Sequence, residues 1–139
     1  MADRGTLVMD VDGTLCPTKK PGQDYQALVP HHAMVRRLSE WRRRGHRIVL
    51  FTARNMRTYD GDLAKIHRHT APILVAWLER WKIPYDELVF GKPWPGENGL
   101  YVDDRAVRPD EFLDLTRAEL QALIDRSRRR LETLADIDA

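Results

Sequence analysis

Residues 6–14 read TLVMDVDGT, an apolar run that ends in two aspartates, a glycine and a threonine. The apolar part, residues 6–9, predicts a short buried β-strand. Residues two apart on a strand lie on the same face, so the carboxylates of Asp10 and Asp12 converge where the chain turns at Gly13. Such a pair suits a divalent metal ion, or a nucleophile beside a general acid or base. The alternative is an ordinary acidic turn, because Asp-Gly is a common turn dipeptide.

Three further apolar runs also end in chemically useful side chains. They are Thr52 at the end of 46–52, Lys92 after 87–90, and Asp103 with Asp104 at the end of 100–103. Strands that alternate with helical segments predict an α/β fold, a parallel sheet with helices on both faces. The carboxyl ends of parallel strands meet at one crevice, so these side chains are expected beside Asp10 and Asp12. The sequence therefore predicts a metal site with a phosphate-binding cradle next to it.

In this order, the four motifs resemble those of the magnesium-dependent phosphatases of the haloacid dehalogenase (HAD) superfamily. The motifs are Asp10-Val11-Asp12-Gly13-Thr14-Leu15, Thr52, Gly91-Lys92-Pro93 and Asp103-Asp104, and the resemblance covers about residues 6–112. It implies a Rossmann-like core in which the strands lie in the order three, two, one, four, with the first motif on a central strand. It also implies phosphomonoester hydrolysis as the activity and Mg²⁺ as the cofactor.

The resemblance implies a catalytic role for each motif residue. Asp10 attacks phosphorus and becomes an aspartyl-phosphate, and Asp12 is first the general acid and then the general base. Thr52 donates its hydroxyl to the transferring phosphoryl group, and Lys92 neutralises charge on Asp10 and the phosphoryl oxygens. Lys65 is a rival for the lysine role because it also lies between the second and third motifs, but the Gly-Lys-Pro context favours Lys92.

Magnesium would be held by acids from two motifs. The resemblance implies the Asp10 carboxylate, the Asp12 backbone carbonyl and one acid of the Asp103-Asp104 pair as ligands. Asp104 is favoured as the direct ligand, with Asp103 behind it. A solvated acidic turn is the alternative for that pair.

The segment after the second motif offers candidate substrate-binding residues, which are Arg54, Asn55 and Arg57. A guanidinium near the crevice can hold a second anionic or hydroxylated part of a substrate, and a solvated loop is the alternative. Residues 51–56, 91–93 and 102–105 are most similar to small phosphatases of bacterial capsule and surface-polysaccharide synthesis. That similarity implies a small sugar or polyol phosphate as the substrate.

Length and composition describe one globular domain over residues 1–139, with a C-terminal helix at about 116–135. Cys16 is the only cysteine, which excludes an internal disulfide and fits a reducing, cytoplasmic location. An inert small residue is the better reading of Cys16 than a nucleophile. No stretch reaches the ~20 apolar residues of a membrane span, so no membrane partner is expected.

The spacing of the motifs leaves no room for a cap domain over the site. Between Thr14 and Thr52 lie 37 residues, most of which one helix and one strand account for. Between Thr52 and Lys92 lie 39 residues, which one loop, one helix and one strand account for. We therefore expect a capless, open site. Capless relatives often form tetramers, so the resemblance also predicts a homo-oligomer, either a dimer or a tetramer.

Two other functions compete with a sugar or polyol phosphatase. The first is a polynucleotide-end phosphatase, because such domains pair a similar first motif with an Asp-Asp-Arg motif. A net charge of +2 argues against nucleic acid, and the arginine runs 42–44 and 128–130 are better read as solvated helix faces. The second is a non-catalytic binding protein on the same fold, which the complete set of motif residues disfavours.

Overall fold

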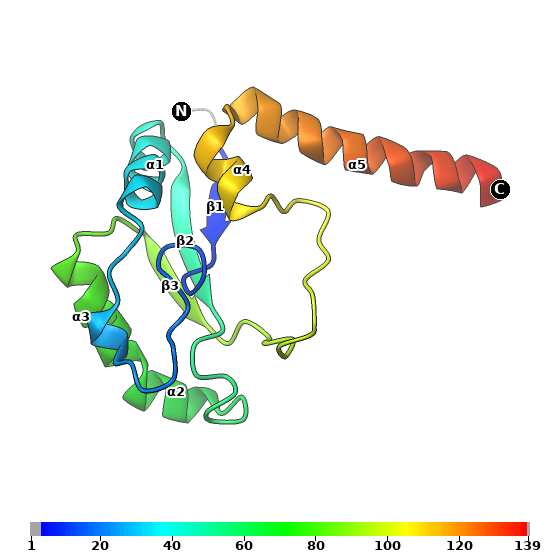
Figure 1. The fold of residues 1–139 in the computed structure, drawn as a ribbon. Helices are drawn as coiled ribbons and strands as arrows, with labels where there is room; N and C mark the ends of the chain where they lie inside the picture. The colour runs from blue at the N-terminus through cyan, green and yellow to red at the C-terminus, as the bar shows by residue number, and fades with distance from the viewer. Residues whose placement is uncertain (1–3, 139) are drawn as a thin grey trace. The chain divides into compact units, whose positions relative to one another are not determined.

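The computed structural model describes residues 4–138 (Figure 1). The chain divides into two compact units, with the boundary between Trp94 and Pro95. The first unit contains three strands, three α-helices and a short 3-10 helix. They are β1 (Thr6–Met9), η1 (Tyr25–Ala27), α1 (His32–Arg43), β2 (Arg47–Thr52), α2 (Leu63–His69), α3 (Ala71–Arg80) and β3 (Glu87–Phe90). The second unit contains α4 (Pro109–Asp114) and α5 (Arg117–Asp138).

The first unit is built around a parallel sheet with the strand order β1-β2-β3. Leu7 lies opposite Ile48 in the register, and Leu50 lies opposite Leu88. Parallel neighbours need a crossover between them, and here α1 forms the first crossover while α2 and α3 form the second. The α/β class and the parallel arrangement predicted from the sequence are confirmed, and the order of these three strands agrees with the expected one.

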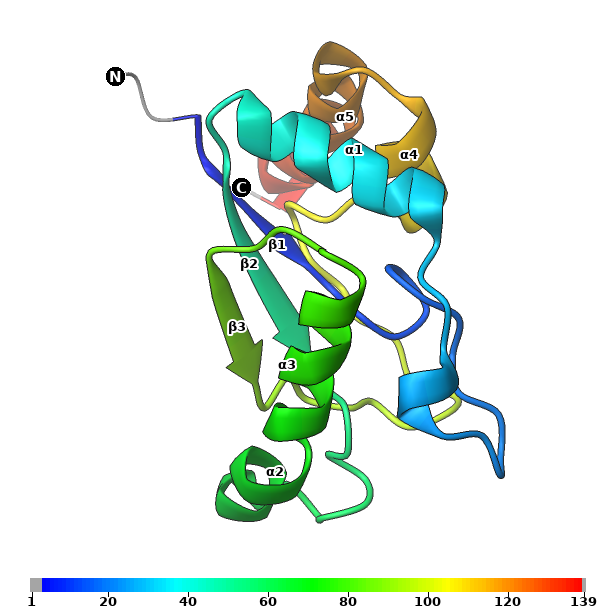
Figure 2. The ribbon, with the colours of Figure 1, turned by 90° about the vertical axis from the view of Figure 1, so that its left-hand side faces the viewer.

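Helices α1 and α3 lie on the same side of the sheet, as both views show (Figures 1 and 2). Both crossovers carry the chain in the same direction across the sheet, and right-handed connections then place both helices on one face. That face holds the core. Its buried side chains are Ile48 and Leu50 of β2, Met34, Leu38 and Trp41 of α1, and Leu74, Trp77 and Leu78 of α3.

The opposite face of the sheet is also apolar, but no helix of the described part of the first unit, residues 4–94, covers it. Alternation along the strands places Val8, Val49, Phe51 and Val89 on this face. Val8 is 58% exposed, whereas Ile48 and Leu50 on the helical face are fully buried. Helices on both faces, and the HAD family with its capless architecture, stay predictions.

The fourth strand predicted at 100–103 is not formed. Residues 99–103 have no regular secondary structure, and Leu100 and Val102 are 84% and 96% exposed. A strand requires its backbone N–H and C=O groups to pair with a neighbouring strand, and three apolar residues in a row do not guarantee such pairing. The run also ends in a turn, in which Asp103 Oδ1 accepts a hydrogen bond from the Arg105 N–H at 2.8 Å.

Two short helices lie where the sequence reasoning expected none. Asp62 caps α2, because its carboxylate accepts a hydrogen bond from the Lys65 N–H at 3.2 Å. In the second unit, Pro109 begins α4 in the first helical turn, where proline is favoured. The start of α5 has a capping box, since Thr116 and Glu119 bond to each other's backbone N–H groups at 3.2 and 3.0 Å.

Candidate active site

The candidate site of the first unit lies at the carboxyl ends of its three strands. Asp10 directly follows β1, Arg54 is two residues beyond β2, and Lys92 is two residues beyond β3. Side chains from neighbouring parallel strands meet at this edge of a sheet, as the sequence reasoning expected. Two of the predicted residues, Asp10 and Lys92, are in direct contact here.

The Asp10 carboxylate is held by a lysine and a hydroxyl. The Lys92 ammonium Nζ lies 3.2 Å from Asp10 Oδ1, and the Thr14 hydroxyl donates to Asp10 Oδ2 at 3.0 Å. The Lys92 backbone N–H donates to the Thr52 carbonyl at 3.2 Å, which ties the turn after β3 to the end of β2. These bonds fix the ammonium on the predicted nucleophile.

The Asp12 carboxylate is held by Arg54 in a two-point ion pair. Arg54 Nη2 lies 2.8 Å from Asp12 Oδ1, and Arg54 Nε lies 3.0 Å from Oδ2. The Arg54 side chain is only 1% exposed, so its end of this charge-assisted pair is shielded from water, whereas the Asp12 side chain is 23% exposed. We predicted Arg54 as a substrate-binding residue, and the structure places its guanidinium on Asp12.

The stacking partner of Arg54 was missed by the sequence reasoning. The Tyr25 ring centroid lies 4.2 Å from the Arg54 Cζ, and the Lys19 ammonium lies 5.4 Å from the same centroid. The segment around Tyr25 is fixed to α3, because Trp77 Nε1 donates to the Leu28 carbonyl at 2.7 Å. Burial, followed by the negative charge of Asp12, raises the pKa of Tyr25. The feature of the sequence that could have indicated this contact is a single aromatic residue, Tyr25, in a polar loop.

Cys16 lies next to the two acids but is not a nucleophile at neutral pH. The chain turns after Asp12 through Gly13, whose φ of 84° is rarely adopted by other residues and whose N–H donates to the Cys16 carbonyl at 2.8 Å. Burial and the charge of Asp12 raise the pKa of the Cys16 thiol to about 12. A thiol with that pKa stays protonated at neutral pH, which agrees with the inert role expected for it.

Three other predicted residues shape the loop that follows β2. Thr52 is 1% exposed, and its hydroxyl oxygen accepts a hydrogen bond from the Arg54 N–H at 3.0 Å. The Asn55 side chain bonds to the hydroxyls of Thr58 and Thr70, at 3.1 and 2.7 Å, and its φ is 60°. Asn55 is therefore engaged in holding the loop.

Arg57, the third of these residues, lies over an aromatic ring. Its guanidinium is 5.3 Å from the ring centroid of Trp94. Trp94 is two residues beyond Lys92, so this contact joins the loop after β2 to the loop after β3. Arg57 is exposed, unlike Arg54.

The carboxylate oxygens of the site are of the kind that Mg²⁺ binds, but two cations already balance their negative charge. Asp10 and Asp12 supply carboxylate oxygens, which Mg²⁺ prefers, and Lys92 and Arg54 already match their two negative charges. Among residues 4–138, no three His, Cys, Asp or Glu side chains gather into a metal-binding group. A divalent cation at Asp10 would therefore need further anionic ligands.

The acids predicted as further ligands belong to the second unit. Asp103 and Asp104 are both exposed, and Asp103 makes the turn contact with the Arg105 N–H described above.

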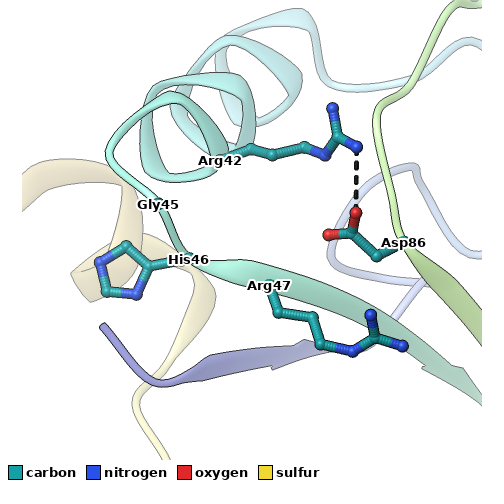
Figure 3. Close-up of a pocket in the computed structure, with 5 residues that line it drawn as sticks. All are labelled: Arg42, Gly45, His46, Arg47 and Asp86. Carbon is teal, nitrogen blue, oxygen red and sulfur yellow. Dashed lines mark hydrogen bonds and ion pairs between the residues drawn. The ribbon is translucent and has the colours of Figure 1, made fainter. Parts of the chain in front are cut away.

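A shallow hollow lies at the opposite end of β2, where Arg42 and Asp86 form an ion pair at 3.0 Å (Figure 3). The hydrogen bond from Arg42, with a second from the Ile48 N–H at 2.8 Å, lowers the pKa of Asp86. Arg47 also lines this hollow and pairs with Glu87 at 3.1 Å. Two of the arginines here are thus neutralised by acids, and the hollow lies at the amino end of β2, away from Asp10.

Comparison with known proteins gives one strong match. A crystal structure of a structural-genomics target from Vibrio cholerae is 43% identical in sequence and superimposes with a TM-score of 0.84, over 88% of this chain and 98% of that chain. The two chains belong to one family. A chain of a Pnkp1/Rnl/Hen1 complex is 17% identical with a TM-score of 0.47, over 81% of this chain and 35% of that chain. No family model and no curated protein matches the sequence.

No helix within residues 4–138 is long and apolar enough to cross a membrane.

Proposed function

We propose that the chain is a magnesium-dependent phosphatase of the HAD type, which hydrolyses a small sugar or polyol phosphate in polysaccharide synthesis. One observation carries this proposal. Two carboxylates follow the first strand, and each is bound by a cation from the end of another strand, Lys92 on Asp10 and Arg54 on Asp12. An ordinary acidic turn has no need of two partly or fully buried cations, whereas phosphoryl transfer needs positioned charge of both signs.

In the proposed reaction, Asp10 is the nucleophile and Asp12 moves the proton. A carboxylate oxygen of Asp10 bonds to phosphorus while the ester P–O bond breaks, and Asp12 gives a proton to the departing alkoxide. Water then attacks phosphorus, Asp12 takes its proton, and the Asp10–phosphorus bond breaks to release inorganic phosphate. Each Asp12 oxygen accepts one hydrogen bond from Arg54 and keeps a second lone pair, which can take up the proton.

Lys92 and Thr52 would serve the transferring phosphoryl group. Lys92 is 3.2 Å from Asp10 Oδ1, where its ammonium neutralises charge that builds up on the phosphoryl oxygens. The Thr52 hydroxyl oxygen is fixed by the Arg54 N–H, so its proton can be directed to an acceptor such as a phosphoryl oxygen.

The metal would be held by the Asp10 carboxylate, the Asp12 backbone carbonyl and the pair Asp103 and Asp104, with Asp104 as the direct ligand. When bound, Mg²⁺ would supply charge stabilisation to the phosphoryl group. An open site without a cap, a cytoplasmic location and a homo-oligomer, either dimer or tetramer, belong to the same proposal.

The test is phosphate release from a panel of sugar, polyol and nucleoside monophosphates, with magnesium and with a chelator. We expect release that depends on magnesium, with sugar or polyol phosphates preferred over nucleotides. No release from any ester by folded, magnesium-loaded protein would contradict the proposal. A preference for nucleoside monophosphates over sugar and polyol phosphates would replace the substrate class and keep the chemistry.

A further inference from the structure

We propose that Trp94 and Arg57 form a subsite for a sugar ring, so that the enzyme prefers ring-closed sugar phosphates over open-chain polyol phosphates. This inference rests on the proposed phosphatase function, and it chooses between the two substrate types that the proposal leaves open. The subsite would hold the alcohol part of the ester while the phosphoryl group lies at Asp10.

The two residues belong to the loops that carry the two cations of the site. Arg57 is three residues beyond Arg54, which binds Asp12, and Trp94 is two residues beyond Lys92, which binds Asp10. The Arg57 guanidinium lies 5.3 Å from the Trp94 ring centroid, so the pair joins these loops at the carboxyl ends of β2 and β3. A substrate whose phosphate reaches Asp10 would extend its alcohol past this edge of the sheet.

Trp94 is presented to solvent on a stiff backbone. The residue is 42% exposed, although large aromatic residues are usually well buried. Proline stands on each side of it, at positions 93 and 95. Proline fixes its own φ and restricts the residue before it to extended conformations, so little conformational entropy remains to be lost when a ligand covers the indole.

The chemistry of the pair suits a cyclic sugar. The indole offers a flat, apolar, electron-rich face, and a sugar ring presents a face of C–H groups to it. Arg57 has N–H donors and no acceptor, which matches the hydroxyl oxygens around the rim of a sugar. An open-chain polyol has no fixed face and must lose the freedom of several rotatable bonds to make the same contact.

The experiment compares esters with the same carbon skeleton, one of which closes into a ring while the other is reduced at C1 and stays open. The kcat/KM for hexose 6-phosphates is measured beside that for the corresponding hexitol 6-phosphates, in wild type, Trp94→Leu, Trp94→Phe and Arg57→Gln. We expect the wild type to prefer the ring-closed member of at least one pair. Trp94→Leu should lower kcat/KM for that ester about tenfold and for its open-chain partner about twofold, and Trp94→Phe should restore most of the difference.

A matched control lies near the opposite edge of the sheet, just before the amino end of β3. Trp81 lies under the Arg80 guanidinium at 5.0 Å, just after α3 and before β3, so it is a similar pair away from the strands' carboxyl ends. Trp81→Leu should leave the ratio of ring-closed to open-chain turnover unchanged, even where it lowers stability.

The outcomes separate this inference from the proposed function. Equal turnover of both members of every pair, or an equal loss for both in Trp94→Leu, would overturn the ring subsite and leave the phosphatase standing. A larger loss for nucleoside 5′-monophosphates than for hexose phosphates would assign Trp94 to a nucleobase and overturn the sugar ring. No phosphate release from any ester would overturn the proposed function and this subsite with it.

Discussion

At the scale of single residues, each acid of the site is paired with its own cation, Lys92 with Asp10 and Arg54 with Asp12. The spacing of Asp10, Asp12 and Lys92 along apolar runs was enough to place them at one edge of a sheet. The contact between Arg54 and Asp12 joins residues 42 positions apart, and the stacking of Tyr25 on Arg54 depends on a loop fixed by α3. Such contacts arise from tertiary packing, which no local pattern encodes.

The Arg54 ion pair should contribute strongly to stability. Arg54→Ala leaves the Asp12 carboxylate without its buried partner, so we expect the free energy of unfolding to fall by about 2–4 kcal/mol. Arg47→Ala is the matched control, because its pair with Glu87 is half exposed and should contribute about 0.5 kcal/mol or less. Urea unfolding measures the loss in the free energy of unfolding for each variant. Equal losses for Arg54→Ala and Arg47→Ala would contradict the expectation that burial of Arg54 makes its ion pair the stronger one.

The buried Cys16 thiol should be unreactive in the folded protein. Its pKa is raised to about 12, so iodoacetamide at pH 8 should label the urea-unfolded chain much faster than the native one. The raised pKa also makes the free energy of unfolding depend on pH. Because the folded pKa lies above the ordinary value, the protonated Cys16 thiol makes its full contribution to stability at neutral pH. That contribution is lost as the pH rises from about 8.5 toward 12. Rapid labelling of native protein would show that the thiol is accessible and ionisable.

At the scale of elements, the apolar runs at 6–9, 46–52 and 87–90 predicted strands that the structure contains, while the short helices were not predicted. Helices α2 and α4 have seven and six residues, too few for a clear helical pattern, and are marked mainly by Asp62 and Pro109 at their starts. The predicted strand at 100–103 has the right composition but no backbone partner. Apolar composition indicates that a segment can form a strand, and only pairing makes it one.

Asp86 should hold the end of α1 against the sheet, because it bonds to a residue of each. Its carboxylate accepts from Arg42 at 3.0 Å and from the Ile48 N–H at 2.8 Å, so Asp86→Asn should lower the free energy of unfolding by about 1–2 kcal/mol at pH 7. Its pKa is lowered, so this contribution is present above about pH 3.9 and fades as the pH falls through the folded pKa. Urea unfolding at pH 7 and pH 3 measures both effects, and an undiminished difference at pH 3 would contradict the account.

At the scale of the whole molecule, composition and length predicted a single domain, and this stays a prediction beside the two compact units of the chain. The four tryptophans, at positions 41, 77, 81 and 94, all belong to the first unit, whereas the longest helix, α5, belongs to the second. Tryptophan fluorescence therefore reports on the first unit, whereas circular dichroism at the helical band also receives a large contribution from the second. Charge pairs between residues far apart in the sequence also form at this scale, which is why the motifs alone could not define the geometry of the site.

The two units should unfold together if they form one domain. We expect urea transitions followed by tryptophan fluorescence and by circular dichroism at the helical band to have the same midpoint and slope. The measurement needs only the full chain. Separate midpoints, with helical signal lost at a different urea concentration from fluorescence, would show that the C-terminal helices unfold as an independent body.

The central claim is that Asp10 forms a covalent bond to phosphorus. The most direct measurement is magnesium-dependent phosphate release by Asp10→Asn, beside Asp60→Asn, which alters an exposed loop acid of the same unit. The account predicts a loss of about a thousandfold or more in kcat for Asp10→Asn, because an amide cannot serve as the nucleophile, and near wild-type release for Asp60→Asn. Folded Asp10→Asn protein that retains wild-type release would contradict the account.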